Sequence, residues 1–211
     1  MPQDHRIGLV FATMIEAGPF IQGLSLTGTM EKPFEVYEND RISLIISGIG
    51  KANASMACTY LITARTPSLI CNLGAAGATT DRYRLGQCLH VHKIIEPDRP
   101  GLITGKPHEH QTVMLDGFET AVLATQDRPV ITGIERDMIA PAADLVDMEA
   151  ASIAQVCRRM AVPCYIFKFI SDTPGTAQIV SIVDTITRLG GAFYQFFHDR
   201  VQGLLHEAAG L

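Results

Sequence analysis

The chain has 211 residues, of which 47% are hydrophobic and 18% are charged, and its formal net charge is −5. This length is typical of one domain, and the composition predicts a large buried core rather than a disordered chain. Nucleic-acid binding needs clustered Lys and Arg side chains, whereas the basic residues of this acidic chain are scattered. We therefore expect no nucleic-acid partner.

The N-terminal sequence MPQDHRIGLVFA lacks the basic-then-apolar pattern of a signal peptide, and its apolar stretch is too short to span a bilayer. The five cysteines are odd in number, lie in apolar settings and form no CxxC pair. Reduced, buried thiols are typical of cytosolic proteins. These features predict a cytoplasmic protein without membrane contact.

Apolar runs alternate with helical patterns along much of the chain. Strands buried on both faces are predicted at residues 7–12, 42–47, 68–73 and 164–170. Helices are predicted at residues 51–65, 148–160 and 178–206, the last with a break near Gly190–Gly191. This alternation predicts an α/β fold in which helices flank a mixed, mainly parallel central sheet.

The middle of the chain has a different pattern. Between residues 86 and 131, the segments QCLHVHKII and TVMLDGFETAVLAT read as strands without an intervening helix, and residues 97–111 form a Pro/Gly-rich loop. We expect these strands to be antiparallel or edge strands of the main sheet. Because there is no clear linker or repeat, residues 1–211 are predicted to form one domain.

Ligands of open α/β sheets bind beyond the carboxyl ends of the strands, so the residues that follow each predicted strand are candidates for a site. Glu16 follows the first strand, and Ser171 and Asp172 follow the last. The glycine-rich turns GIGKAN and GAAGA follow the second and third. Two carboxylates and two turns are therefore expected to meet at one edge of the sheet.

Each of these features also has a purely structural interpretation. Glu16 could favour a helix start, and Asp172 could cap a helix. Asp147 and Glu149 could be an acidic first turn. Neither glycine-rich turn has the spacing of a P-loop or a dinucleotide fingerprint, so both could be tight strand-to-helix turns. Only the convergence of these features indicates a functional site.

Four histidines form a second candidate cluster. His90 and His92 alternate along a predicted strand, and His108 and His110 lie in the following loop. Such residues could ligate zinc, but neither a thiolate pair nor an HExxH motif accompanies them. We predict no metal site.

Five segments, IGLVFATMIEAGPF, SGIGKANAS, CNLGAAGA, LVDMEAASIAQVC and FISD, occur in an order that resembles the purine nucleoside phosphorylase superfamily. The most similar branch is that of the 5′-methylthioadenosine/S-adenosylhomocysteine nucleosidases. The resemblance implies a homodimeric enzyme without a cofactor that hydrolyses the N-glycosidic bond of a purine nucleoside, including 5′-modified ones. The match extends from residue 7 to about residue 172 and is poor in the middle third.

The resemblance also implies roles for single residues. Asp172 would be the general acid at purine N7, and Glu16 would be the general base that activates water. Glu149 would accept hydrogen bonds from the ribose hydroxyls, Met148 would pack on the sugar, and Asp147 would open the helix. Further substrate contacts are expected from Ile49, Gly74, Ala75, Val130, Lys168 and Ser171, with Ile49 and Ile182 beside the 5′ substituent.

Several positions depart from the family pattern. Asn72 stands where related phosphorylases hold phosphate with an arginine, which favours water as the nucleophile. Ala75, Lys168 and Pro129 replace a serine, an arginine and an aromatic residue, respectively. These changes fit a shifted substrate such as futalosine, or a slow relative. Two alternatives stay open: a phosphorolytic purine nucleoside phosphorylase, and a catalytically weak nucleoside-binding protein.

Overall fold

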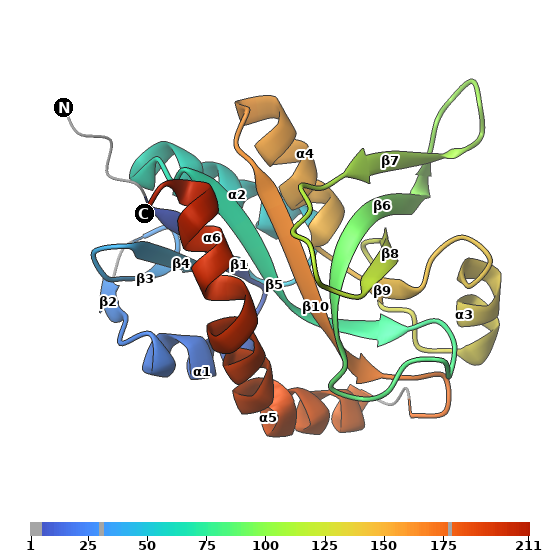
Figure 1. Cartoon of the computed structure of the whole chain (residues 1–211). Coiled ribbons are helices and arrows are strands. Elements are labelled where there is room, and N and C mark those ends of the chain that lie inside the picture. The colour runs from blue at the N-terminus through green and yellow to red at the C-terminus, as the bar shows by residue number, and fades with distance from the viewer. Residues whose placement is uncertain (1–5, 30–31, 177–178) are drawn as a thin grey trace.

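The centre of the molecule is a parallel sheet of four strands (Figure 1). The computed structural model describes residues 6–29, 32–176 and 179–211. The four strands are β1 (Ile7–Phe11), β4 (Ile42–Ile46), β5 (Leu69–Ala78) and β10 (Cys164–Asp172), in the order β4-β1-β5-β10. Every residue of β1 and β10 is buried, as expected for strands covered on both faces. The four predicted apolar runs are confirmed as strands.

The long strands β5 and β10 also belong to a closed ring. Antiparallel pairing joins β5 to β9 (Leu145–Asp147) and β10 to β6 (Cys88–Pro100), while β8 (Thr120–Thr125) lies parallel between β9 and β6. The expectation of antiparallel or edge strands was therefore wrong for β8, which has a parallel neighbour on each side. Ring closure needs pairings between residues far apart in the sequence, which periodicity does not reveal.

The Pro/Gly-rich stretch at 97–111 is not a loop throughout. β6 continues to Pro100, and β7 (Pro107–Gln111) pairs back on it to form a hairpin. Proline is compatible with this arrangement because β7 is an edge strand and Pro107 is its first residue. On the other side of the molecule, the short strands β2 (Thr27–Thr29) and β3 (Glu35–Glu38) extend the sheet beyond β4.

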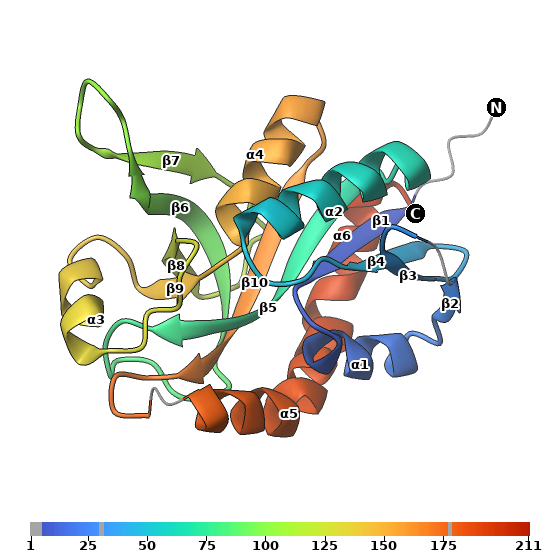
Figure 2. The same cartoon turned by 180° about the vertical axis from the view of Figure 1, so that it is seen from behind.

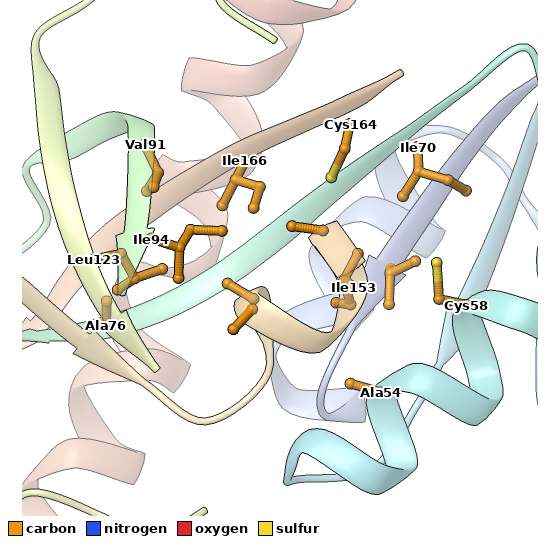
Figure 3. Packing of buried hydrophobic residues seen from close by; sticks show 14 of the residues in the cluster. Ala54, Cys58, Ile70, Ala76, Val91, Ile94, Leu123, Ile153, Cys164 and Ile166 are labelled. Carbon is orange, nitrogen blue, oxygen red and sulfur yellow. The ribbon is translucent and has the colours of Figure 1, made fainter. Parts of the chain in front are cut away.

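Helices cover both faces of the sheet (Figures 1 and 2). On one face, α2 (Lys51–Arg65) and α4 (Ala150–Met160) pack together, and Figure 3 shows their buried side chains against the strands. The other face carries α1 (Met14–Gly23), α5 (Ile179–Phe196) and α6 (Gln202–Ala209). The predicted mixed sheet flanked by helices is confirmed.

The C-terminal helix does not break at its two glycines. α5 runs through both, and the irregularity comes later, as the π-helical turn η1 (Phe197–Val201) that leads into α6. A Cβ atom on Gly190 would lie 3.1 Å from Cγ of Pro19 in α1. The glycine therefore allows close packing of two helices. Within the described residues, no helix is both long and apolar enough to cross a bilayer.

Candidate active site

Carboxylates from distant parts of the sequence line one cavity of about 420 Å³ at the carboxyl ends of the central strands. These residues are Glu16, Asp147, Glu149 and Asp172. The predicted residues Ile49, Ala75, Val130, Met148 and Ser171 also line it, together with Pro129 and Ile182. Gly74 and Lys168 are not among the lining residues. The structure thus brings together most of the predicted site.

Glu16 holds the start of α1 and also faces the cavity. Its Oε2 atom accepts hydrogen bonds from the backbone N–H of Thr13, at 3.0 Å, and from the Thr13 hydroxyl, at 2.8 Å, in a capping box. Its Oε1 atom accepts a hydrogen bond from the N–H of Ala75 at 2.8 Å. A Cβ atom on Gly74 would lie 2.8 Å from this oxygen. Gly74 therefore provides room for Glu16 rather than lining the cavity.

Asp147 ends the short strand β9 instead of lying in the first turn of a helix. Its Oδ2 atom accepts a hydrogen bond from the N–H of Ala150 at 3.0 Å, so its side chain still caps the start of α4. Its Oδ1 atom accepts a hydrogen bond from the Thr125 hydroxyl at 2.5 Å. Met148 and Glu149 lie between the strand and the helix, where their side chains reach the cavity.

Lys168 lies behind the cavity. It is only 2% exposed, and its Nζ atom is 2.9 Å from Oδ2 of Asp147. Burial alone would lower the pKa of Lys168, but the carboxylates of Asp147, Glu149 and Glu16 outweigh that effect and raise it. The lysine is therefore a fixed positive charge that balances the acidic groups, and this replaces the predicted direct contact with substrate.

Glu149 connects α4 to the turn that precedes α2. Its Oε1 atom accepts a hydrogen bond from the N–H of Gly50 at 2.9 Å. Burial raises the pKa of Glu149 to about 7, and the nearby Asp147 carboxylate adds to the rise. The opposing effects of Lys168 and of the Gly50 N–H are smaller. Glu149 thus changes charge near neutral pH.

Asp172 has a partner that the sequence reading missed. Arg136, in α3 (Gly133–Ile139), forms a buried ion pair with Asp172 through Nη2. The second oxygen of Asp172 accepts a hydrogen bond from the Ser171 hydroxyl at 2.6 Å. The sequence contained a signal for α3, because TGIE at 132–135 forms a capping box with Thr132 and Glu135.

Asn72, from which the sequence analysis predicted water as the nucleophile, lies beside the cavity rather than in it. Asn72 is buried, and its Nδ2 atom donates a hydrogen bond to the carbonyl of Val10 at 3.0 Å. Among the described lining residues, Arg136 is the sole basic side chain, and it is paired with Asp172. The described lining therefore offers no unpaired cation for a phosphate dianion.

Two of the four candidate histidines, His90 and His110, make structural contacts. His90 is buried and stacked on Phe167, with ring centroids 4.1 Å apart, and its Nδ1 atom lies 2.9 Å from the carbonyl oxygen of Ile166. His110 is also buried, and its Nε2 atom is 2.8 Å from Oε1 of Glu96. These contacts favour a packing role for both.

Comparison with known proteins establishes the family. The family model of the phosphorylase superfamily matches residues 18–130 and 134–199. The chain belongs to this superfamily. Among curated members, the 5′-methylthioadenosine/S-adenosylhomocysteine nucleosidase of Oceanobacillus iheyensis is 31% identical over 164 residues, which cover 66% of this chain and 72% of the relative. The nucleosidase of Geobacillus thermodenitrificans is 30% identical and covers 65% and 69%.

Solved structures with low sequence identity share the fold. The apo 5′-methylthioadenosine nucleosidase of Arabidopsis thaliana superposes with a TM-score of 0.84 at 20% identity, covering 95% of this chain and 96% of the other. A futalosine hydrolase mutant of Helicobacter pylori superposes with a TM-score of 0.81 at 20% identity, covering 94% and 99%. The family resemblance predicted from the sequence is confirmed.

Proposed function

We propose that this protein hydrolyses the N-glycosidic bond of a purine nucleoside, releasing the free base and the free sugar. The observation that carries the proposal is that Glu16, Glu149 and Asp172 line one cavity of about 420 Å³, a size that suits a small ligand. The nucleosidase names of the curated relatives support it.

In the proposed reaction, Glu149 accepts hydrogen bonds from the ribose hydroxyls and Met148 packs on the sugar. Asp172 takes up a proton from solvent and delivers it to N7 of the purine as the C1′–N9 bond breaks and its electron pair moves into the base. Asp172 is then again the carboxylate that pairs with Arg136. Glu16 removes a proton from a water molecule, whose oxygen forms the new bond to C1′. The products are a neutral base and a sugar with a hydroxyl at C1′.

Aliphatic side chains dominate the rest of the cavity. Ile15, Ile49 and Ile182 line it, and Ile49 is 56% exposed at its rim. Pro129 occupies the position where an aromatic ring was expected, and the described lining residues include no aromatic side chain. We infer that the 5′ substituent of the substrate is apolar or small, because these residues offer it no charged or hydrogen-bonding side chain.

The proposal is tested by purine release from a panel of 5′-modified nucleosides in phosphate-free buffer. We expect release of base without phosphate, and strict dependence on phosphate would place the protein among the phosphorylases. Binding of these nucleosides without release of base under either condition would instead identify a nucleoside-binding protein.

Replacing Glu149 with glutamine should raise KM about tenfold or more with a smaller effect on kcat, because an amide donor would face the ribose hydroxyl donors. The variant should also discriminate less against 2′-deoxynucleosides.

For the parent, kcat/KM should rise with pH up to about 7 as Glu149 loses its proton and becomes a better acceptor. This rise of kcat/KM with pH should be absent in the variant. An unchanged KM and pH profile would remove Glu149 from the ribose site.

We also propose that the protein is a cytoplasmic homodimer. Leu102 and Ile103 lie between β6 and β7 and are fully exposed, and Met56 on α2 is 55% exposed. Contact with a second copy would cover such apolar side chains. The five free thiols fit a reducing compartment. Sedimentation of a monomer at micromolar concentration would contradict the dimer.

A further inference from the structure

The start of α2 contacts two segments that line the cavity. The backbone N–H of Gly50 donates a hydrogen bond to Oε1 of Glu149 at 2.9 Å, and the next N–H, that of Lys51, donates to Oδ1 of Asp127 at 2.8 Å. Carboxylates are favourable here because the N-terminus of a helix carries partial positive charge. Consecutive N–H groups therefore hold Glu149, the proposed ribose ligand, and Asp127, which shortly precedes the lining residues 129–131.

Segment 127–131 lies at the end of the cavity where the base is proposed to bind. Its residues 129–131 line the cavity. Nη2 of Arg136 donates hydrogen bonds to the carbonyl of Val130, at 2.9 Å, and to Oδ2 of Asp172. Because one nitrogen binds both acceptors, Val130 lies beside the proposed acid. A purine with N7 at Asp172 would therefore contact this segment.

Asp98, in β6, binds both Asp127 and Lys51. Its Oδ2 atom accepts a hydrogen bond from the N–H of Asp127 at 2.9 Å. Nζ of Lys51 lies 2.8 Å from Oδ1 and 2.9 Å from Oδ2 of the same carboxylate, and 3.3 Å from Oε2 of the buried Glu96. Lys51, Asp98 and Asp127 thus form a closed ring of hydrogen bonds that joins α2, β6 and segment 127–131.

The carboxylate of Asp98 is charged at neutral pH. Burial alone would raise its pKa, but the hydrogen bonds from Lys51 and from the N–H of Asp127 outweigh burial and lower it. A charged acceptor binds both donors more strongly than a neutral one. The side chain is 30% exposed and is not among the residues that line the cavity. Asp98 can therefore affect a bound ligand only through the residues that it holds.

We propose that Asp98 is a positioning residue that fixes segment 127–131, through Asp127, against the base of the nucleoside. The inference rests on the proposed function, because that function places the base beside Asp172. The segment would contact the base rather than C1′, so its position should affect substrate binding more than the chemical step. Loss of Asp98 would leave the N–H of Asp127 without this acceptor and would let the segment move.

Asp98→Ala should raise KM for purine release about fivefold or more and leave kcat within about twofold of the parental value. The probe is the panel nucleoside that the parent cleaves best. Glu109→Ala is the matched control, because Glu109 is an ion-paired carboxylate of the neighbouring strand β7, 3.5 Å from Lys93, and does not line the cavity. This control should keep the parental KM. A parental KM for Asp98→Ala, or a loss in kcat alone, would contradict the positioning role.

A second variant tests whether Lys51 and Asp98 act as one unit. Lys51→Met removes the cation that holds Asp98 but keeps the backbone N–H that binds Asp127. It should also raise KM. The double variant should be no worse than Asp98→Ala alone, because the second change removes a contact that is already lost. Effects on KM that multiply in the double variant would show independent roles and contradict the ring.

Hydrogen exchange separates this inference from the proposed function, because it needs no substrate. Peptides that cover residues 127–131 should exchange about tenfold faster in Asp98→Ala than in the parent, while those from β1 and β10 keep their parental rates. Unchanged exchange at 127–131 would refute the positioning role whether or not a nucleoside is cleaved. If exchange rose there but the parent cleaved no nucleoside, the hydrolase proposal would fail while Asp98 would still be shown to hold the segment.

Discussion

Asp172→Asn should lower the kcat of purine release by about two orders of magnitude or more. The asparagine side chain has nearly the same shape but cannot deliver a proton to N7. It would also replace a charged partner of Arg136 by a neutral amide. The loss should shrink for substrates whose base leaves readily without protonation, because the missing step then contributes less to the barrier. Steady-state kinetics with an easily cleaved and a poorly cleaved nucleoside measures both effects.

Asp184→Asn provides the matched control for this change. Asp184 is an exposed residue of α5 and does not line the cavity, so the same substitution there should leave kcat near the parental value. If Asp172→Asn were as active as this control, Asp172 would not be the acid. An equal loss for both kinds of substrate would show that Asp172 acts in some way other than protonation of the leaving group.

Glu16→Gln should also lower kcat by about two orders of magnitude or more, but evenly across substrates. Every substrate needs the same activated water, so leaving-group quality should not change the loss. The substitution also weakens the capping box with Thr13, which contributes about 1 kcal/mol to the free energy of unfolding. Denaturant unfolding, measured beside kinetics, separates the two effects.

Glu135→Gln is a control with the same local geometry. Glu135 forms a capping box with Thr132 at the start of α3 but does not line the cavity. This variant should show a similar small loss of stability and keep most of the activity. If both Glu→Gln variants lost activity equally, the effect at Glu16 would come from the helix start rather than from catalysis.

The parts of the fold that could be predicted are those determined by the local pattern of apolar residues in the sequence. Strands β1 and β10 were recognisable because they are buried on both faces and therefore continuously apolar. The two carboxylates Glu16 and Asp172 were placed correctly at strand ends because parallel strands end at one edge of the sheet.

The parts that were missed depend on contacts between distant segments. β9 has only three residues and is defined by its pairing with β5 and β8. Arg136 could not be assigned to the site because its partner Asp172 lies 36 positions away, across a ring that periodicity does not show. Gly190 indicated a helix break, whereas its contact with Pro19 makes it a packing position.

The identity of the sugar product when water and phosphate are both present tests the central claim most directly. The reaction is run with a large excess of inorganic phosphate, and the sugar is identified by mass spectrometry. Because the single basic side chain of the described cavity lining is paired with Asp172, we expect water to be the nucleophile and the product to be the free sugar. Formation of the sugar 1-phosphate would contradict the account.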